Sequence, residues 1–574
     1  MGATLSTGKK DQTNILKICL FVFTLGVCLK RIFADFDYDS GYAAAIGYRI
    51  LKGDRMFAEM WEPHQISAFL CAFLELIYIK IAGTTTGIIL YLHVMGAVIK
   101  TAVAMVFYKA LGKVFARDNA FVTSCIFMIL SPKLLIIPEY SNMQVYSSVL
   151  LFSFLIFFIT DKKPVYLALS SVSLFLAVLA YPSCVIMWIA ALIILFRYTD
   201  KGLKNLCFLT LICLFLGILY MGGFALSLGI HDFLNGIAHI ATSDPSHSAG
   251  VLSKLTGYGK DLLSILASYI IIAGISVLAV RIKNCVKKDS GETNRKNFVI
   301  IFLILCGIWQ ISDALMMNTD YCFLEFQTGL LIAGLVMSLG KKNLQKDVLS
   351  IALIISVFQM LSTAILSNLS LNSSLGYMIL GVCISFSYLY EYETGKDAPE
   401  RLGFIRIFPV IPIVFINLFI VRSMSFCYIN LTDIAGVSKK GPMIGIFSEY
   451  MAPYILDRTY EEWQDIIPDG STVLISGNCG MMDGASSLEY LFKDVEIAVK
   501  DTQTSCVIDE SQGQYFIEHP EKKPDVVEIV CWYGESKEPD DSWLMNMLRD
   551  NYGDEYISQN YYDGSYRRYY FLNK

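Results

Sequence analysis

Charged residues are scarce in this sequence. They make up 17% of its 574 residues, whereas hydrophobic residues make up 55% and the mean hydropathy is +0.52. Soluble domains carry about 25% charged residues, so this composition excludes an ordinary soluble protein. Apolar runs of about 20 residues, the length that crosses a bilayer, recur over the first three quarters of the chain. The sequence therefore predicts a polytopic α-helical membrane protein.

A cleavable leader and a disulfide framework are also missing. The first apolar run, 15–33, follows a polar start that contains Lys9 and Lys10, and no small-residue cleavage site comes after it. We expect this run to stay in the protein as a membrane anchor. Most of the 15 cysteines lie within apolar runs, where cysteine acts as a small apolar side chain rather than as a disulfide partner.

The order of apolar runs and basic loops predicts a topology. Loops rich in Lys and Arg stay in the cytoplasm, which places the N-terminus inside and the C-terminal end outside. That arrangement needs an odd number of crossings, so we expect a bundle of about thirteen transmembrane helices. One of the first several candidates is then re-entrant, merged or lying along the interface. The candidates are 15–33, 66–82, 87–108, 119–137, 145–160, 164–181, 183–198, 204–229, 261–281, 297–316, 321–339, 347–367, 373–391 and 404–424.

The predicted domains follow from the same pattern. They are a cytoplasmic N-terminus (1–14), a transmembrane domain (15–424) with a first outside loop at 34–65 and a long outside loop at 230–260, and an extracytoplasmic domain (425–574). The last domain has no G-x-G-x-x-G fingerprint of nucleotide binding. Its alternating apolar segments predict a small α/β domain, with strands at 471–477, 494–500, 525–534 and 566–573 and helices at 485–492 and 542–551.

Three aspartates, Asp35, Asp37 and Asp39, follow directly on the first apolar run. In one interpretation Asp39 only caps the next helix and the other two are solvated loop charges. In the other, carboxylates at the mouth of a membrane cavity act as a general base or bind a divalent ion. A D-x-D pair by itself does not decide between these interpretations.

The residues after the aspartates predict a short helix at the membrane surface. Tyr42, Ile46 and Ile50 fall on one helical face, and Gly53 ends the pattern.

Four cationic or ionisable groups, Arg49, Lys52, Arg55 and His64, lie within 25 residues of Asp39. A carboxylate that faces several cations suits transfer of a group away from a phosphate. The carboxylate accepts the proton of the attacking hydroxyl, and the cations stabilise the departing phosphate. The alternative is that these side chains only anchor a helix to anionic lipid headgroups.

The segment SGYAAAIGYRILKGDRMFAEMWEPHQISAFL (40–70), with the acidic residues before it, resembles the first-loop signature of the GT-C membrane glycosyltransferases. That superfamily includes protein O-mannosyltransferases, lipid A aminoarabinose transferases and transferases that use polyprenyl-phosphate-linked galacturonic acid. The likeness covers 33–82. It is looser from there to about residue 200, a range that includes IPEYSNMQ (137–144) at a second outside loop. It implies a GT-C-like helical bundle with a C-terminal outside domain.

The resemblance also implies roles for individual residues. The family uses a first-loop aspartate as catalytic base, and Asp39, directly before SGY, best matches that position, with Asp37 second. Glu139 corresponds to a further acidic residue in the second outside loop. Ser40 stands where many relatives have Glu, so a divalent cation, Mg²⁺ or Mn²⁺, stays an open expectation. The implied donor-phosphate contacts are Arg49, Lys52, Arg55 and His64.

The implied activity is transfer of a sugar from a polyprenyl phosphate, with inversion, to a glycan, lipid or cell-wall acceptor outside a bacterial membrane, with no nucleic-acid partner. One alternative is a transporter or flippase of lipid-linked sugars. It would need ionisable residues at the membrane midplane and internal repeats, and the sequence has few of the first and none of the second. Another alternative is a non-catalytic protein of cell-envelope polymer assembly, whose outside domain does the binding.

Glu75, His93 and Lys100 are ionisable residues inside predicted spans. Such residues are costly in a membrane and often functional. We expect Glu75 and Lys100 to form a structural ion pair. The functional alternative places Lys100 near a lipid-linked phosphate.

Overall fold

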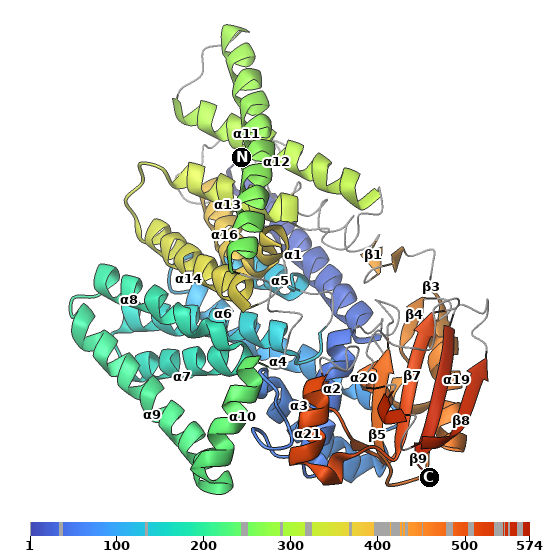
Figure 1. Cartoon of the computed structure of the whole chain (residues 1–574). Coiled ribbons are helices and arrows are strands. Elements are labelled where there is room, and N and C mark those ends of the chain that lie inside the picture. Colours follow the sequence, from blue (N-terminus) through green and yellow to red (C-terminus); the bar gives the residue numbers. More distant parts are fainter. Residues whose placement is uncertain are drawn as a thin grey trace.

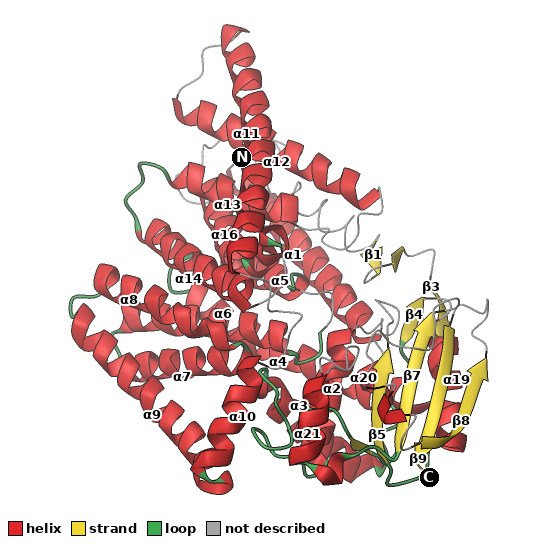
Figure 2. Ribbon diagram, in the orientation of Figure 1, coloured by secondary structure: helices red, strands yellow, loops and turns green. Residues whose placement is uncertain are grey.

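The computed structural model describes most of the chain. The described residues are 2–33, 38–132, 136–242, 251–286, 291–315, 324–366, 370–394, 414, 425–426, 429–430, 434–449, 452–477, 486–502, 510–532, 544, 546–548, 552–559 and 566–573. Helices fill the first two thirds of the sequence, and a small sheet lies near its end (Figures 1 and 2).

The helices of the N-terminal part follow the predicted apolar runs closely. Gly83 ends one of them in the left-handed conformation, with φ of 69°, and Pro164 begins another at a position where its missing N–H costs nothing. The helices are α1 (Gly2–Phe33), α2 (Tyr38–Leu51), α3 (Gln65–Ala82), α4 (Ile88–Leu111), α5 (Arg117–Ile129), α6 (Tyr140–Asp161), α7 (Pro164–Ala180), the 3₁₀ turn η1 (Pro182–Ile186), α8 (Met187–Tyr198) and α9 (Gly202–Leu228). The predicted helix of the first loop is thus confirmed as α2, whereas its position at the membrane surface stays a prediction.

The segment 230–260, predicted as a long outside loop, is helical in the residues that the structure describes, 230–242 and 251–260. Residues Ile230–Thr242 form helix α10, and α11 (Val251–Val286) begins well before the predicted span at 261. The reason is an apolar face on α10, from which Phe233 packs against Phe57 of the first loop. The helical bundle is completed by α12 (Gly291–Leu315), α13 (Leu324–Ser338), α14 (Leu344–Leu366), α15 (Leu371–Ser374), η4 (Leu375–Tyr377) and α16 (Ile379–Thr394).

Seven helices in the described part of the chain are long and apolar enough to cross a membrane. They lie in α3, α4, α6, α9, α11, α12 and α14, and shorter apolar helices are found at 164–180, 182–198 and 326–338. The prediction of a mostly helical protein with several spans is confirmed, whereas the count of thirteen is not. The predicted span at 404–424 lies almost entirely outside the described residues. Leu226 and Leu263 are strongly exposed on α9 and α11, as lipid-facing side chains would be.

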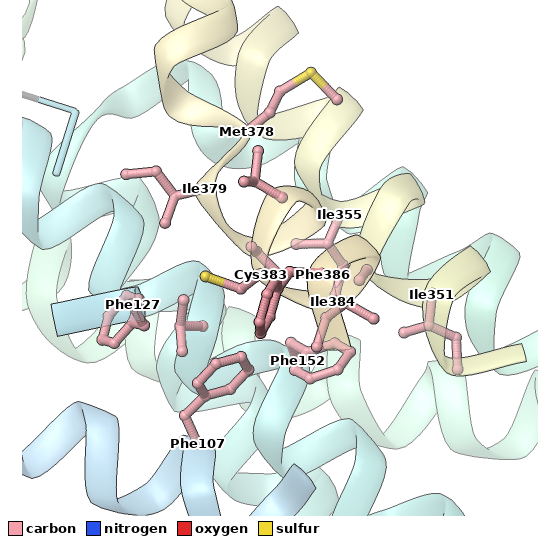
Figure 3. Close-up of a cluster of buried hydrophobic side chains, with 14 of the residues drawn as sticks. Phe107, Phe127, Phe152, Ile351, Ile355, Met378, Ile379, Cys383, Ile384 and Phe386 are labelled. Atoms are coloured by element: carbon pink, nitrogen blue, oxygen red, sulfur yellow. The ribbon is translucent and has the colours of Figure 1, made fainter. Parts of the chain in front are cut away.

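The core of the bundle is a layer of aromatic and aliphatic side chains between α4, α5, α6, α14 and α16. Phe107, Phe127 and Phe152 meet Ile355 and Phe386 there, all with almost no exposed surface (Figure 3). Burial of side chains of this size contributes roughly 1.5–3 kcal/mol each in water, and close packing replaces that contribution where lipid is the solvent.

The C-terminal domain is built on a five-stranded mixed sheet with the order β6-β5-β7-β9-β8. Its strands are β5 (Thr472–Gly477), β6 (Glu496–Ile497), β7 (Val526–Trp532), β8 (Tyr552–Gln559) and β9 (Tyr566–Asn573). The pairs β5–β6 and β5–β7 are parallel, whereas β7–β9 and β8–β9 are antiparallel. Short elements precede or connect them: β1 (Ser425–Phe426), β2 (Ile429–Asn430), β3 (Ile434–Val437), η6 (Gly441–Met443), β4 (Phe447–Glu449), α19 (Ala452–Ile466), α20 (Ser486–Glu489), α21 (Glu510–Glu518) and η8 (Pro520–Lys522).

The strands predicted at 471–477, 525–534 and 566–573 correspond to β5, β7 and β9, and the strand predicted at 494–500 shrinks to β6. The edge strand β8 was missed because its sequence, YGDEYISQ, carries two acidic residues and little apolar alternation. Helix α19 was also missed, although its pattern of Leu456 and Trp463 on one buried face is a helical signal.

The first loop and the C-terminal domain share one hydrophobic core. Ala45, Tyr48 and Trp61 of the first loop belong to the same buried cluster as Val473 and Val527 of the sheet. Figure 1 shows the sheet, in orange and red, beside α2 and α3, in blue. The described parts of 34–65 and 425–574 therefore pack as one unit, although 359 residues of chain lie between the two ranges.

Candidate functional site

Asp39 lies in the first turn of α2 and is half-buried. Tyr140, the first residue of α6, donates a hydrogen bond from its hydroxyl to Asp39 Oδ1 at 3.0 Å. The N-terminal end of a helix favours a negative charge, so the position stabilises Asp39 as a carboxylate. The carboxylate is thus fixed where α2 meets α6.

His64, the residue before α3, lies beside the same tyrosine. Its ring stacks on Tyr140 with a centroid distance of 3.9 Å and on Tyr181 at 5.2 Å. Its Nδ1 lies 2.9 Å from the carbonyl oxygen of Ala180, so this nitrogen carries the proton and donates it. We call Asp39, Tyr140 and His64 the Asp39 cluster. It joins one carboxylate, one hydroxyl and one imidazole from the starts of three helices.

Glu139 is buried directly beside this cluster. Its Oε2 accepts from the backbone N–H of Ser141 and its Oε1 from that of Asn142, both at 2.6 Å. This is the geometry of an N-terminal helix cap. Glu139 therefore fixes the start of α6 and, with it, the position of Tyr140; its predicted catalytic role stays a prediction.

Arg49 is completely buried, and all three nitrogen atoms of its guanidinium donate hydrogen bonds. Nε donates to Asp54 at 2.8 Å, Nη1 to Glu62 at 3.4 Å and to the Thr502 hydroxyl at 3.1 Å, and Nη2 to the Glu59 carbonyl at 2.6 Å. Burial alone would lower the pKa of Arg49, but the charge of Asp54 and its neighbours outweighs burial and keeps that pKa above the ordinary value. All of these hydrogen bonds are made to other residues of the protein.

The buried charges around Arg49 connect the first loop to the C-terminal domain. Lys522 Nζ donates to Asp54 Oδ1 at 2.5 Å, and the backbone N–H of Thr502 donates to Glu62 Oε1 at 2.8 Å. We call Arg49, Asp54, Glu62, Thr502 and Lys522 the buried ionic network. Because removal of water from charges is costly, such a network is stable only when every member keeps its partners.

The other two predicted cations of the first loop also have carboxylate partners. Lys52 pairs with Asp494, and its pKa is lowered, mainly because burial disfavours the charged form. Arg55 Nη2 lies 2.6 Å from Glu59 Oε1. Burial raises the pKa of Glu59, but its hydrogen bonds from Arg55 outweigh that effect and leave the pKa below its ordinary value. Of the four predicted donor-phosphate contacts, the structure brings only His64 into the Asp39 cluster.

Sequence reasoning missed the partners that organise the site. Tyr140 is 101 residues from Asp39, and Thr502 is 453 residues from Arg49. No local pattern signals such pairs. Two of the first-loop aspartates that sequence reasoning did single out, Asp35 and Asp37, lie outside the described residues.

The predicted ion pair between Glu75 and Lys100 is not formed. Lys100 donates to the backbone carbonyl of Leu130, at the end of α5. Both carboxyl oxygens of Glu75 are buried without a hydrogen-bond partner. The long Lys100 side chain satisfies a carbonyl at the C-terminal end of α5, and Glu75 stays fully buried on α3.

One group of side chains in the described part of the chain has the composition of a metal site. Glu59, His519 and Glu521 each offer one ligand atom, and these atoms lie within 4.8 Å of one another. Glu59 comes from the first loop, His519 follows α21 and Glu521 lies in η8, and the group does not include Asp39.

No protein-family model and no curated protein sequence matches the chain. Among solved structures, the chain is similar to the oligosaccharyltransferase of Archaeoglobus fulgidus, tethered with an acceptor peptide, at 10% identity and a TM-score of 0.46, over 97% of this chain and 74% of that one. A complex of the Archaeoglobus fulgidus oligosaccharyltransferase AglB with an inhibitory peptide and dolichol-phosphate shows 12% identity and a TM-score of 0.41, over 98% and 74%. ArnT from Cupriavidus metallidurans shows 10% identity and a TM-score of 0.42, over 99% and 98%.

Proposed function

We propose that this protein is a membrane glycosyltransferase that moves a sugar from a polyprenyl-phosphate donor to an acceptor outside the membrane. The observation that carries the proposal is the Asp39 cluster. A half-buried carboxylate is oriented by the Tyr140 hydroxyl, next to an imidazole, in a protein whose other helices offer long lipid-facing surfaces. A lipid-linked substrate needs both features, because its chain lies in the bilayer while its headgroup reaches water.

In the proposed reaction, Asp39 accepts the proton of the acceptor hydroxyl. The hydroxyl oxygen attacks the anomeric carbon, and the bond from that carbon to the donor phosphate oxygen breaks on the opposite face, which inverts the configuration. The bond electrons leave with the polyprenyl phosphate, and the proton held by Asp39 passes to water. General-base catalysis of this kind contributes typically about 10²- to 10⁴-fold. Tyr140 holds the carboxylate in the direction of attack.

His64 is the donor-phosphate contact that the geometry favours among the residues predicted for this role, since it lies in the Asp39 cluster. Lys52 and Arg55 would first have to leave Asp494 and Glu59. One partner of each pair is largely exposed, Asp494 at 73% and Arg55 at 57% of the side-chain surface, whereas Lys52 and Glu59 are at 21% and 12%. A donor phosphate that took either cation would therefore have to replace its carboxylate partner. For Arg49 we propose instead a structural role in the buried ionic network.

We further propose that α3 lies along the membrane surface and does not cross it. The C-terminal domain contacts the chain on both sides of this helix. Before α3, the backbone N–H of Trp61 donates to the Lys500 carbonyl. After α3, the Thr85 hydroxyl donates to the Leu491 carbonyl at 2.8 Å. An open sheet with two edge strands does not occur in lipid, where its free N–H and C=O groups would stay unpaired. Both ends of α3, about 27 Å apart, thus face the same aqueous side, which removes one crossing from the predicted candidates.

Cysteine labelling in intact cells tests this placement. With a membrane-impermeant maleimide, Thr84→Cys, in the turn after α3, should be labelled from outside. Lys113→Cys, beyond the crossing helix α4, should be labelled only after permeabilisation, with the labelling of the natural cysteines subtracted. Protection of Thr84→Cys in intact cells would instead make α3 a true span.

A transfer assay tests the proposed function. The purified protein in liposomes should move a labelled sugar from a polyprenyl phosphate to an acceptor fraction of cell-envelope glycans and lipids, with inversion seen by NMR. Movement of the intact donor across the bilayer without transfer would favour the transporter alternative. Donor binding with neither transfer nor movement would favour the assembly alternative.

A further inference from the structure

The side chains of Glu59, His519 and Glu521 gather at the contact between the first loop and the C-terminal domain. Their ligand atoms lie within 4.8 Å of one another, and His519 Nδ1 is 3.3 Å from Glu521 Oε1. Glu59 and His519 are mostly buried, with 12% and 17% of their side-chain surface exposed, whereas Glu521 is 58% exposed. An ion bound among them would therefore have two sheltered ligands and one side open to water.

The charge around this group favours a cation. Arg55 feels the charges of Glu59, Glu521 and Asp232, and Glu518 lies 3.3 Å from His239. Three carboxylates thus act on one guanidinium in this corner of the molecule, and Glu518 adds a fourth carboxylate beside His239. A divalent ion would balance the excess of negative charge that Arg55 leaves uncompensated.

Arg55 forms an ion pair with Glu59 in the structure. A metal ion would therefore have to compete with Arg55 for the Glu59 carboxylate. The Arg55 side chain is 57% exposed and can move fully into water, whereas Glu59, at 12%, stays mostly buried and gains the metal ion as its new partner. The backbone around Glu59 stays fixed when Arg55 leaves, because the Glu59 carbonyl accepts from both Arg49 and Tyr515. The carboxylate, whose Oε2 also accepts from the Arg55 backbone N–H at 2.8 Å, would then have to turn toward His519.

We propose that Glu59, His519 and Glu521 form a Zn²⁺ site that joins the first loop to the C-terminal domain. One imidazole nitrogen with two carboxylates is a ligand set that suits Zn²⁺, whereas Mg²⁺ and Ca²⁺ prefer oxygen ligands alone. Three protein ligands leave a fourth position for water on the exposed side of Glu521. Zinc–ligand bonds are about 2.0–2.2 Å long, so the three side chains must close inward by small rotations. The site is separate from the Asp39 cluster and does not depend on the proposed transfer reaction.

Calorimetry with zinc chloride on the full-length protein in detergent, first treated with a chelator, tests this site. We expect binding of one Zn²⁺ per chain and a rise of several degrees in the thermal unfolding midpoint. His519→Ala and Glu59→Gln should each weaken binding at least tenfold. His231→Ala, which alters an exposed histidine beside Asp232 on α10, should leave it unchanged.

Two results would overturn the proposal. One is the absence of stoichiometric Zn²⁺ binding by the wild-type protein. The other is binding that persists at wild-type strength in both His519→Ala and Glu59→Gln. Neither measurement uses a sugar donor, so failure of this site and failure of the proposed transfer activity are told apart.

Discussion

Asp39→Asn should lower sugar transfer by about 10²- to 10⁴-fold, because the amide cannot take a proton from the acceptor hydroxyl. Asparagine keeps the shape of the side chain and can still accept the hydrogen bond from Tyr140. The unfolding midpoint and the amount of protein in the membrane should therefore stay close to wild type. The measurement is the initial rate of transfer in liposomes at saturating donor, with the protein content of each preparation determined.

The matched control is Asp118→Asn. Asp118 also stands in the first turn of a helix, α5, and pairs with Lys17 at 2.9 Å. Lys17 is about 24 Å along α1 from Phe33, the end nearest the Asp39 cluster. This variant should keep the wild-type rate. Full activity of Asp39→Asn would reject Asp39 as the base, and loss of transfer in Asp37→Asn alone would move that role two residues upstream.

Tyr140→Phe should lower the transfer rate as well, but by less than Asp39→Asn. It removes the hydroxyl that donates to Asp39 and retains the ring that stacks on His64. Hydrogen bonds to charged groups contribute about 1.5–3 kcal/mol, so the rate should fall by roughly 10- to 150-fold, which is less than for Asp39→Asn. The double variant should be no slower than Asp39→Asn alone if the tyrosine acts only through the carboxylate.

Arg49→Met should destabilise the contact between the first loop and the C-terminal domain by about 3–5 kcal/mol. Methionine fills part of the space but leaves Glu62 without its buried cation and Asp54 with Lys522 alone. Both carboxylates are almost fully removed from solvent, so water cannot replace the guanidinium. The measurement is chemical denaturation in detergent, followed by tryptophan fluorescence, since Trp61 and Trp463 are both buried in the shared core.

Arg458→Met is the control, because it removes an arginine that is not part of the buried ionic network. Arg458 pairs with Glu462 one helical turn away on α19, and its side chain is 33% exposed. Pairs of this kind contribute about 0.3–0.5 kcal/mol, so this variant should unfold close to wild type. Equal denaturation midpoints for Arg49→Met and wild type would mean that the buried ionic network does not hold the two parts together.

Local chemistry determined a large part of this structure. The scarcity of charge and the length of the apolar runs predict a membrane-embedded helical protein, because transfer of each side chain into lipid depends on that side chain alone. The face formed by Tyr42, Ile46 and Ile50 predicted α2, and the apolar alternation around Val473 and Val527 predicted β5 and β7. Predictions of this kind need only neighbours a few positions apart.

The partners of the charged and polar side chains were decided only by the tertiary structure. Asp39 meets Tyr140, Arg49 meets Thr502, and Lys100 meets the Leu130 carbonyl and not Glu75. A buried charge must be satisfied by whatever donor or acceptor the packing brings near it, and that choice depends on the whole fold. The sequence by itself therefore determined which residues are able to do chemistry at the first loop. Only packing against the C-terminal domain decided which of them are bound inside the protein and which lie in the Asp39 cluster.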